Sequence, residues 1–305
     1  MEQGTVVSIG TFDGVHLGHQ AILRELRQQA EARSLASLVY AFSVPPRWAL
    51  KDGDERYLLL PTDRKLDLLG EAVDLVHPVT FESVRSMPPE AFIDEVLIKQ
   101  LQARVIVEGE SFRFGRGRSG NLRTLRSLGT QKGLDVVCVP PVMVGDAASS
   151  STRIREAVSS GDFQTARACL GRSPILTAPV VHGDQLGREL GYPTANLDVG
   201  PHILLPQPGI FLVHAQGARV SASGLLYIGS RPTLGQGGLR CEVHLLDFTP
   251  RPLYGEVLEV HLLERLRGDR AFSSLETLQA QIETDVVTAY KRLSNYAATD
   301  KRISS

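Results

Sequence analysis

The sequence predicts two domains of different class: an α/β domain with a Rossmann-like parallel sheet, then a small antiparallel β-barrel with a terminal helix. The length of 305 residues exceeds what one hydrophobic core usually holds. In the first half, apolar stretches of strand length alternate with helical patterns, which is typical of an open parallel sheet. In the second half, strand-like stretches follow one another across glycine and proline turns, which is typical of a barrel.

The composition is that of an ordinary globular protein, with 42% hydrophobic residues and a formal charge of -1. This balance gives no reason to expect a nucleic-acid or membrane partner. The apolar runs are too short to span a bilayer, and the chain starts with a strand instead of a leader, so we expect a cytoplasmic protein. We also expect a monomer or a weak homo-oligomer. Cys138, Cys169 and Cys241 lack metal-like spacing and are expected to be reduced structural thiols.

The first strand, turn and helix lie in residues 6–33. Val6, Val7 and Ile9 form a short apolar run that predicts a buried strand. Residues 20–33 place Ile22, Leu23, Leu26 and Ala30 on one face, which predicts a helix. The stretch GTFDGVHLGH therefore joins a strand to a helix.

The residue types of this turn suit phosphate binding. Gly10, Gly14 and Gly18 let backbone approach a ligand closely, and the first amides of a helix attract anions. His16 and His19, three apart, are expected on one face of the helix start, facing the same anion. Half of a zinc site and a pair of solvated histidines are the two alternatives.

Four more strands and three more helices are expected in the first half. The strands are residues 37–42, 75–79, 104–107 and 134–139, and the helices are residues 62–71, 89–100 and 121–128. Ligands of such sheets bind beyond the carboxyl ends of the strands, where the glycine-punctuated turn is expected.

Two later segments of the first half carry polar groups suited to a nucleotide. GESFRFG at residues 109–115 follows a strand, and its alternative is a basic, solvated loop. SSTRIR at residues 150–155 opens a helix, where hydroxyls and the forked donors of Arg155 suit phosphate oxygens. Its alternative is a helix N-cap followed by an ordinary amphipathic helix.

The second half begins after a predicted helix at residues 163–170 and a predicted linker at residues 171–179. We place the domains at residues 1–172 and 173–305. The predicted strands are residues 178–182, 209–215, 221–228, 241–246 and 257–266. A final helix at residues 275–293 carries an apolar stripe that predicts packing on the barrel.

The stretch GDQLGRELGYPTAN, residues 183–196, is the most informative part of the second half. Gly183, Gly187 and Gly191 allow a loop to lie against phosphates. Thr194 and Asn196 occupy alternate positions of an extended segment, so both side chains are able to face one Mg²⁺ and its nucleotide. A glycine-rich loop with a turn is the alternative.

Both halves resemble the family of bacterial bifunctional riboflavin kinase/FAD synthetases. GTFDGVHLGH is similar to the GxFDGxHxGH signature of its nucleotidyltransferase domain, and GDQLGRELGYPTAN resembles GxxxGRxLGxPTAN of its riboflavin kinase domain. GESFRFG, SSTRIR, YIGSRPTL, CEVHLLDF and LRGDRAF resemble five further segments. The resemblance covers nearly the whole chain.

The resemblance implies two ATP-dependent steps: phosphorylation of riboflavin to FMN, then adenylylation of FMN to FAD, with Mg²⁺ held by Thr194 and Asn196. It implies Glu242 as the base that accepts the ribityl hydroxyl proton, and His16, His19 and Arg155 as catalytic groups of adenylylation. The implied ATP-binding residues are Gly10, Phe12, Asp13, Gly14, Gly18, Ser150, Ser151, Thr152, Gly183, Gly187, Gly191 and Thr194. The implied flavin-binding residues are Ser111, Phe112, Phe114, Arg231, Arg267 and Asp269.

From the residues alone, a strand with Glu242 and His244 facing solvent is the alternative for CEVHLLDF. Two departures weaken the adenylylation half: the family's F-x-P-H-P reads FSVPP at residues 42–46, without the histidine, and Ser111 stands where Asp or Asn is usual. The alternatives are therefore a riboflavin kinase with a weak or inactive adenylyltransferase domain, and a sensor that binds flavin or nucleotide without turnover.

Overall fold

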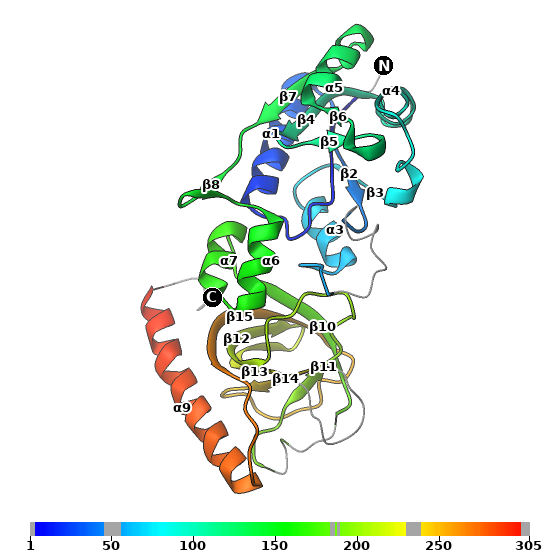
Figure 1. Ribbon diagram of the computed structural model, residues 1–305. Coiled ribbons are helices and arrows are strands. Elements are labelled where there is room, and N and C mark those ends of the chain that lie inside the picture. Colours follow the sequence, from blue (N-terminus) through cyan, green and yellow to red (C-terminus); the bar gives the residue numbers. More distant parts are fainter. Residues whose placement is uncertain (1–3, 46–55, 184–186, 188–189, 230–238, 300–305) are drawn as a thin grey trace. The chain divides into compact units, whose positions relative to one another are not determined.

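The computed structural model describes residues 4–45, 56–183, 187, 190–229 and 239–299, and it separates into two compact units (Figure 1). The N-terminal unit comprises Met1–Ile154 and Ala168–Gly171, and the barrel unit comprises Arg155–Arg167 and Arg172–Ser305. Residues 155–167 thus group with the barrel unit. The boundary expected after residue 172 stays a prediction.

The N-terminal unit contains a five-stranded parallel sheet with strand order β3-β2-β1-β4-β7. The strands are β1 (Thr5–Gly10), β2 (Ala36–Phe42), β3 (Leu75–Val79), β4 (Ala103–Gly109) and β7 (Asp135–Val139). Two short hairpins pair β5 (Arg113–Phe114) with β6 (Gly120–Asn121) and β8 (Met143–Val144) with β9 (Ala147–Ala148). The predicted parallel sheet is confirmed.

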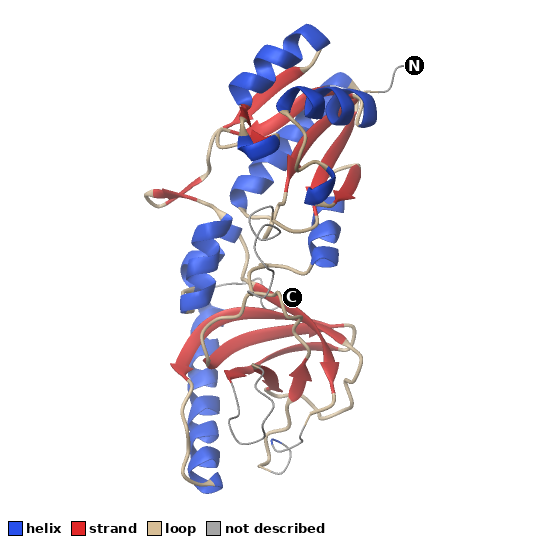
Figure 2. Ribbon diagram, turned by 45° about the vertical axis from the view of Figure 1, so that its right-hand side comes forward, coloured by secondary structure: helices blue, strands red, loops and turns tan. Residues whose placement is uncertain are grey.

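Helices cover both faces of this sheet (Figure 2). The helices are α1 (Leu17–Arg33), α3 (Thr62–Gly70), α4 (Pro89–Ala91), which continues into a π-helical segment (Phe92–Gln100), and α5 (Leu122–Gly129). On one face, α1 and α3 bury Leu26 and Leu69 against Val6. On the other, the π-helical segment and α5 bury their apolar residues against Ile106. Strands buried on both faces explain the continuous apolar runs of the sequence.

The two central strands separate at their carboxyl ends. β1 pairs with β2 from Thr5 to Gly10, but with β4 only from Thr5 to Val7. The strand order also reverses between β1 and β4, since β2 and β3 lie on one side of β1 and the later strands lie on the other. Open α/β sheets bind their ligands at such a switch point.

The barrel unit is a closed antiparallel barrel with strand order β10-β11-β14-β13-β12-β15. The strands are β10 (Ile175–Val181), β11 (Ala195–Leu197), β12 (Gly209–Gly217), β13 (Val220–Gly229), β14 (Arg240–Leu245) and β15 (Val257–Gly268). The predicted barrel is confirmed. The linker predicted at residues 171–179 is wrong in its second part, because Ile175–Pro179 pairs with β15 as a barrel strand.

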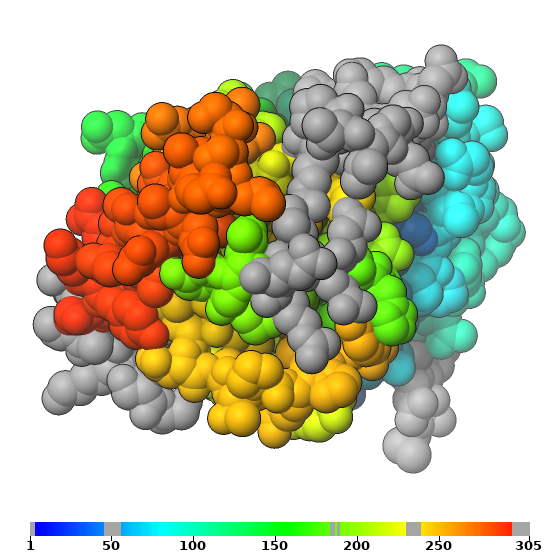
Figure 3. Space-filling view, turned by 90° about the horizontal axis from the view of Figure 1, so that it is seen from below, coloured from blue at the N-terminus to red at the C-terminus, as the bar shows by residue number. Residues whose placement is uncertain are grey.

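Among the described residues, the remaining helices are α6 (Ser151–Ser160), α7 (Phe163–Leu170) and α9 (Leu275–Thr299). Residues 155–167 of α6, α7 and their connection belong to the barrel unit, and the start of α6 and the end of α7 belong to the N-terminal unit. The Phe163 ring of α7 lies 5.6 Å from the Phe211 ring of β12. The predicted packing of the last helix is confirmed, since Ala289 of α9 is buried with Leu212 and Leu225 on the barrel's outer face. In Figure 3 the orange and red residues of α9 form one side of this unit. Within the described ranges, no helix is long and apolar enough to cross a membrane.

Candidate functional site

A row of mostly polar side chains crosses the barrel strands on one face. The strand register places Asn196 of β11 opposite Glu242 of β14, and Glu242 opposite Tyr227 of β13. The row continues to Ile210 of β12 and Arg267 of β15. Directly opposed residues share a face of a sheet, so these five side chains lie on the same side.

That side is the outer face of the barrel. The neighbouring row contains Val243, Leu226 and Phe211, which are in register with one another and fully buried. Successive side chains of a strand point to opposite faces. Since the buried row points inward, the polar row points outward. Glu242 is nevertheless only 8% exposed, so the alternative of a solvated glutamate is wrong.

Glu242 lies beside the PTAN segment. The Thr194 hydroxyl donates a hydrogen bond of 3.2 Å to Oε2 of Glu242. His244, on the same face two residues along β14, places Nδ1 2.9 Å from the carbonyl oxygen of Pro193. Since a carbonyl only accepts, Nδ1 of His244 carries the proton. The two contacts hold the segment before β11 against β14.

Two glycines of the preceding loop allow close approach to the same residues. A Cβ atom at Gly183 would lie 2.1 Å from Nδ2 of Asn196, and one at Gly187 would lie 2.5 Å from the carbonyl oxygen of Tyr192. The same atom at Gly187 would come within 3.3 Å of the Thr194 hydroxyl. Gly191 has a φ of +85°, a left-handed conformation that favours glycine. The structure therefore places Gly183 beside Asn196 and Gly187 beside Thr194.

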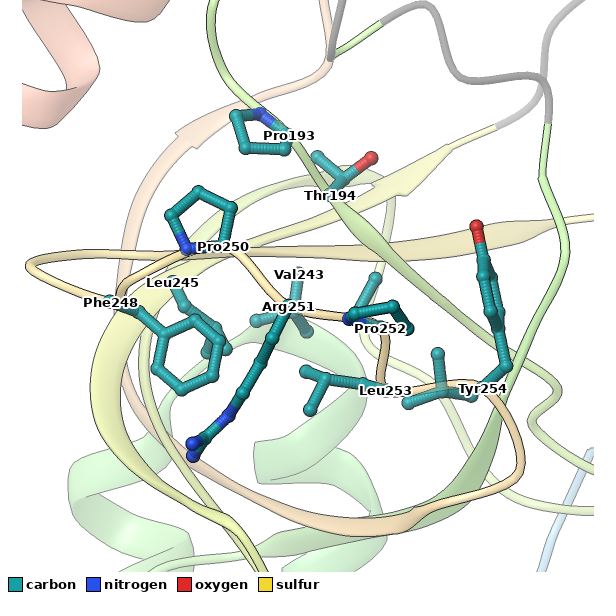
Figure 4. Close-up of a pocket in the computed structure, with 12 residues that line it drawn as sticks. Pro193, Thr194, Val243, Leu245, Phe248, Pro250, Arg251, Pro252, Leu253 and Tyr254 are labelled. Atoms are coloured by element: carbon teal, nitrogen blue, oxygen red, sulfur yellow. The ribbon is translucent and has the colours of Figure 1, made fainter.

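Thr194 also lines a pocket of about 450 Å³ (Figure 4). Its walls are mostly apolar and come from β10, β11, β14 and residues 248–254. Arg251 and Phe248 line it, with the guanidinium 5.0 Å from the ring centre. Tyr254 also lines it and stacks on His182 at 3.8 Å. A mostly apolar cavity with a few polar groups is the usual form of a small-molecule site.

The other end of the polar row is tied to α9. Arg267 binds the buried Asp285 through Nε and Nη2, at 3.0 and 2.8 Å. The Tyr227 hydroxyl lies 3.4 Å from Oδ2 of Asp269. The guanidinium of Arg267 is therefore engaged within the protein, and its contact with a flavin stays a prediction. Arg231 lies outside the described residues.

The turn after β1 is built from unusual backbone conformations. Phe12 and Val15 have φ values of +53° and +41°, and both side chains are buried. Such positive values are uncommon for residues other than glycine and gather at functional sites. Gly14 has a φ of +81°, and a Cβ atom at Gly10 would lie 3.1 Å from the Phe12 ring.

The two histidines have different backbone roles. The helix predicted from residue 20 starts earlier, at Leu17, so His16 is its N-cap and not a helical residue. Nδ1 of His16 accepts from the N–H groups of Gly18 and His19 at 3.1 and 3.4 Å. A neutral His16 therefore carries its proton on Nε2. The His19 ring stacks on the His16 ring with centres 3.7 Å apart, so the structure brings the predicted pair together.

Asp13 links this turn to two other segments. Its carboxylate accepts from the N–H of Leu59 at 3.1 Å, and its carbonyl accepts from the Ser151 hydroxyl at 2.9 Å. Ser150 caps α6, because its hydroxyl accepts from the N–H of Arg153 at 3.3 Å. Thr152 is exposed. Arg155 groups with the barrel unit, so its place beside the histidines stays a prediction.

The GESFRFG segment is partly core. Phe114 is 7% exposed and stacks on Phe112 at 5.6 Å, and the two rings pack against the sheet's cluster. A Cβ atom at Gly120 would lie 2.6 Å from the Phe114 ring, which shows how tightly β6 covers it. Ser111 is exposed. Flavin contacts by these three residues stay predictions.

Two buried ionisable residues near the carboxyl ends of the strands were missed by the sequence analysis. Burial lowers the pKa of Lys65 to about 8, while nearby Asp13 acts in the opposite direction. Burial raises the pKa of Glu108 well above its usual range, although bonds from Ile9 and Ser8 oppose the rise. The glutamate inside the apolar run VIVEG was the one signal in the sequence.

The donor set around Thr194 suits magnesium. Mg²⁺ prefers oxygen ligands and is commonly held by one or two protein groups together with phosphate oxygens. Thr194 and Asn196 supply such oxygens on either side of Ala195, beside the Glu242 carboxylate. Over the described ranges, no group of three or more His, Cys, Asp or Glu side chains is placed to hold a metal ion.

Comparison with known proteins gives two family matches. The FAD synthetase family matches residues 1–153, and the riboflavin kinase family matches residues 170–293. Curated bifunctional riboflavin kinase/FMN adenylyltransferases are similar over most of their length. The protein of Escherichia coli (strain K12) is 34% identical over 94% of this chain and 92% of its own length. That of Pseudomonas fluorescens is 36% identical over the same shares.

A crystal structure is similar over the same extent. It describes a protein from Streptococcus pneumoniae named as a macrolide-efflux protein, 30% identical, with a TM-score of 0.83 over 95% of both chains. That name belongs to the other protein. The two family matches, the identities and the similarity in fold lead to one assignment. The chain belongs to the bifunctional riboflavin kinase/FMN adenylyltransferase family and carries both the riboflavin kinase and the FMN adenylyltransferase (FAD synthetase) activities.

Proposed function

We propose that Glu242 is the general base of riboflavin phosphorylation and that the PTAN segment holds the phosphates of ATP beside it. The observation that carries this proposal is the contact of the Thr194 hydroxyl with Glu242, with Asn196 directly opposite in the strand register. The 5'-hydroxyl of riboflavin is a weak nucleophile. A carboxylate that accepts its proton as it attacks the γ-phosphorus favours transfer, and ADP leaves.

The pocket that Thr194 lines is suited to the nucleoside part of ATP. It shares Thr194 with the Glu242 contact, so a base in the pocket would have its phosphates near the carboxylate. Its apolar walls and the flat groups of Phe248 and Tyr254 suit an adenine ring. Mg²⁺ bound to Thr194 and Asn196 would neutralise charge on the phosphates.

For adenylylation, we assign charge stabilisation to the His16 and His19 pair. The FMN phosphate is already anionic and needs no base when it attacks the α-phosphorus of ATP and releases pyrophosphate. With Nδ1 of His16 directed at backbone amides, its Nε2–H is the donor suited to a phosphate oxygen. Arg155 is assigned to the leaving group because a guanidinium binds phosphate oxygens through two donors.

The first test replaces Glu242. Glu242→Gln keeps the shape of the side chain but removes the base, so riboflavin phosphorylation is expected to fall by about a hundredfold or more. FMN adenylylation in the same sample should stay within twofold. Separate assays of riboflavin to FMN and of FMN to FAD, resolved by chromatography, measure both. Glu283→Gln, an exposed change on α9, is the matched control. Full kinase activity in Glu242→Gln would refute the assignment.

The second test replaces the histidines. His16→Ala combined with His19→Ala should lower FMN adenylylation by about a hundredfold or more and spare the kinase. His77→Ala, at an exposed histidine of β3, is the control. The unmodified chain with riboflavin, ATP and Mg²⁺ distinguishes the alternatives. FAD is the expected product, FMN alone would indicate a weak adenylyltransferase domain, and unchanged riboflavin would indicate a sensor.

Two further expectations stay predictions: a cytoplasmic location, and a monomer or weak homo-oligomer. Neither follows from the absence of a membrane-spanning helix among the described residues. Light scattering across a range of protein concentrations measures the oligomeric state directly.

A further inference from the structure

A buried carboxyl group ends the pairing between the two central strands of the N-terminal unit. In a parallel ladder, every second residue of a strand bonds the same neighbour. The Thr5 N–H bonds the carbonyl of Gln102, and the register with β4 continues to Val7. Ile9 is the next residue whose N–H points toward β4. Its acceptor is Oε1 of Glu108, at 2.5 Å, and not a backbone carbonyl.

Glu108 also receives the Ser8 hydroxyl, with 3.3 Å between Oγ and Oε1. Ser8 is fully buried, and Glu108 is 3% exposed. The side chain therefore spans the opening between β1 and β4 where a ladder bond is lost. Ile9 immediately precedes Gly10, the first residue of the GTFDGVHLGH turn. The carboxyl group thus holds Ile9, the residue directly before the turn.

We infer that Glu108 is a positioning residue for FMN adenylylation: as an uncharged acid, it holds the end of β1 apart from β4 and so sets the turn that faces the phosphates. This inference rests on the proposed role of that turn. Burial favours the neutral form, and none of the described residues supplies a cation to Glu108. A negative charge at this switch point would also repel two polyanionic substrates.

The chemistry predicts different effects for three replacements. Glu108→Gln keeps the acceptor and the neutral charge, so FMN adenylylation should stay within about threefold of the unmodified chain. Glu108→Met keeps the length but leaves the Ile9 N–H without its acceptor, and kcat should fall about tenfold or more. Glu108→Lys places a charge in the buried space between β1 and β4. This variant should show the largest loss of FMN adenylylation or fail to fold.

Riboflavin phosphorylation in the same chain serves as the internal control, because Glu108 lies outside the barrel unit. It should stay within twofold in the Gln and Met variants. Thermal unfolding and far-UV circular dichroism report whether the N-terminal unit remains folded. A Met variant that adenylylates FMN like the Gln variant would overturn the inference.

A second measurement uses only variants that retain the side chain's shape. Ser8 and Ile9 of β1 and Cys138 of β7 are the groups that the described residues place around Glu108, the last by strand register. The unmodified chain should lose FMN adenylylation as the pH rises and Glu108 ionises, whereas Glu108→Gln should keep it. Cys138→Ser excludes the thiol as the cause. A loss of FMN adenylylation in the unmodified chain as the pH falls, not shared by Glu108→Gln, would overturn the inference, because the ionised carboxylate would then be the working form.

The experiments distinguish a failure of the Glu108 inference from a failure of the proposed adenylylation site. If the histidine pair is not catalytic, His16→Ala with His19→Ala retains activity whatever the Glu108 variants do. If only the Glu108 inference fails, the histidine variant is inactive while Glu108→Met stays active.

Discussion

Lys65 is a charged side chain inside the N-terminal unit. It is 2% exposed, and its ammonium group donates to the carbonyl oxygens of Phe42 and Ser43 at 2.7 and 3.0 Å. Phe42 ends β2, so the lysine holds the backbone where the strand leaves the sheet. Buried ammonium groups lose much of their hydration, which explains the lowered pKa.

This lysine predicts a pH-dependent stability. Its pKa is about 8 in the fold against 10.5 as the ordinary value, so between these values the unfolded chain binds more protons. Stability should therefore rise with pH across this window, by about 3 kcal/mol relative to Lys65→Met. Denaturant unfolding of both proteins from about pH 7 to 10.5 measures the difference. Lys132→Met, at a surface lysine, is the control, and a flat difference would contradict the prediction.

At the scale of elements, α9 is fastened to the barrel by apolar contacts and one ion pair. Val286, Ala289 and Leu293 face the outer surface of the strands. Asp285 and Arg267 are 7% and 22% exposed, and they join the helix to β15. The sequence predicted an apolar stripe through Leu278, Ile282, Val286 and Tyr290. Val286 packs on the strands as expected, whereas Tyr290 is 41% exposed. The ion pair, which joins residues 18 apart in the chain, was not predicted.

Breaking this pair should cost stability. Arg267→Leu leaves the buried Asp285 carboxylate without its cation, which typically costs about 3 kcal/mol or more. The double variant Arg267→Leu with Asp285→Leu should recover most of the loss, because no charge then stays buried. Guanidinium unfolding of both single variants and the double variant measures the coupling. A double variant as unstable as the Arg267 variant would contradict this prediction.

The sequence predicted the elements better than the contacts between them. Periodicity and turn residues predicted the central strands, five of the six barrel strands and α9, but not the three-residue strand β11. The roles of Thr194 and Asn196 stay predictions. The roles of Lys65 and Glu108 were not predicted, because their hydrogen bonds to β2 and β1 join segments that are distant in the chain. The start of α1 was predicted three residues too late, because the ring of His16 caps the helix in the way that Ser or Asn usually does.

At the scale of the whole molecule, the two units predict two separate nucleotide sites. Titration with a non-hydrolysable ATP analogue should show two bound nucleotides per chain by calorimetry. The double histidine variant should lose the first site, and Thr194→Val should lose the second. Control variants Glu283→Gln and His77→Ala should retain both. A single bound nucleotide in the unmodified chain would contradict the division of the two reactions.

The alternation of faces in the barrel has a consequence for mutational tolerance. Phe211, Leu226 and Val243 point inward, while Tyr227 and Glu242, their immediate neighbours in the chain, point outward. A deep mutational scan should therefore separate these adjacent codons into two classes: replacements at Phe211, Leu226 and Val243 should reduce the amount of folded enzyme, and replacements at Glu242 should reduce turnover at normal abundance.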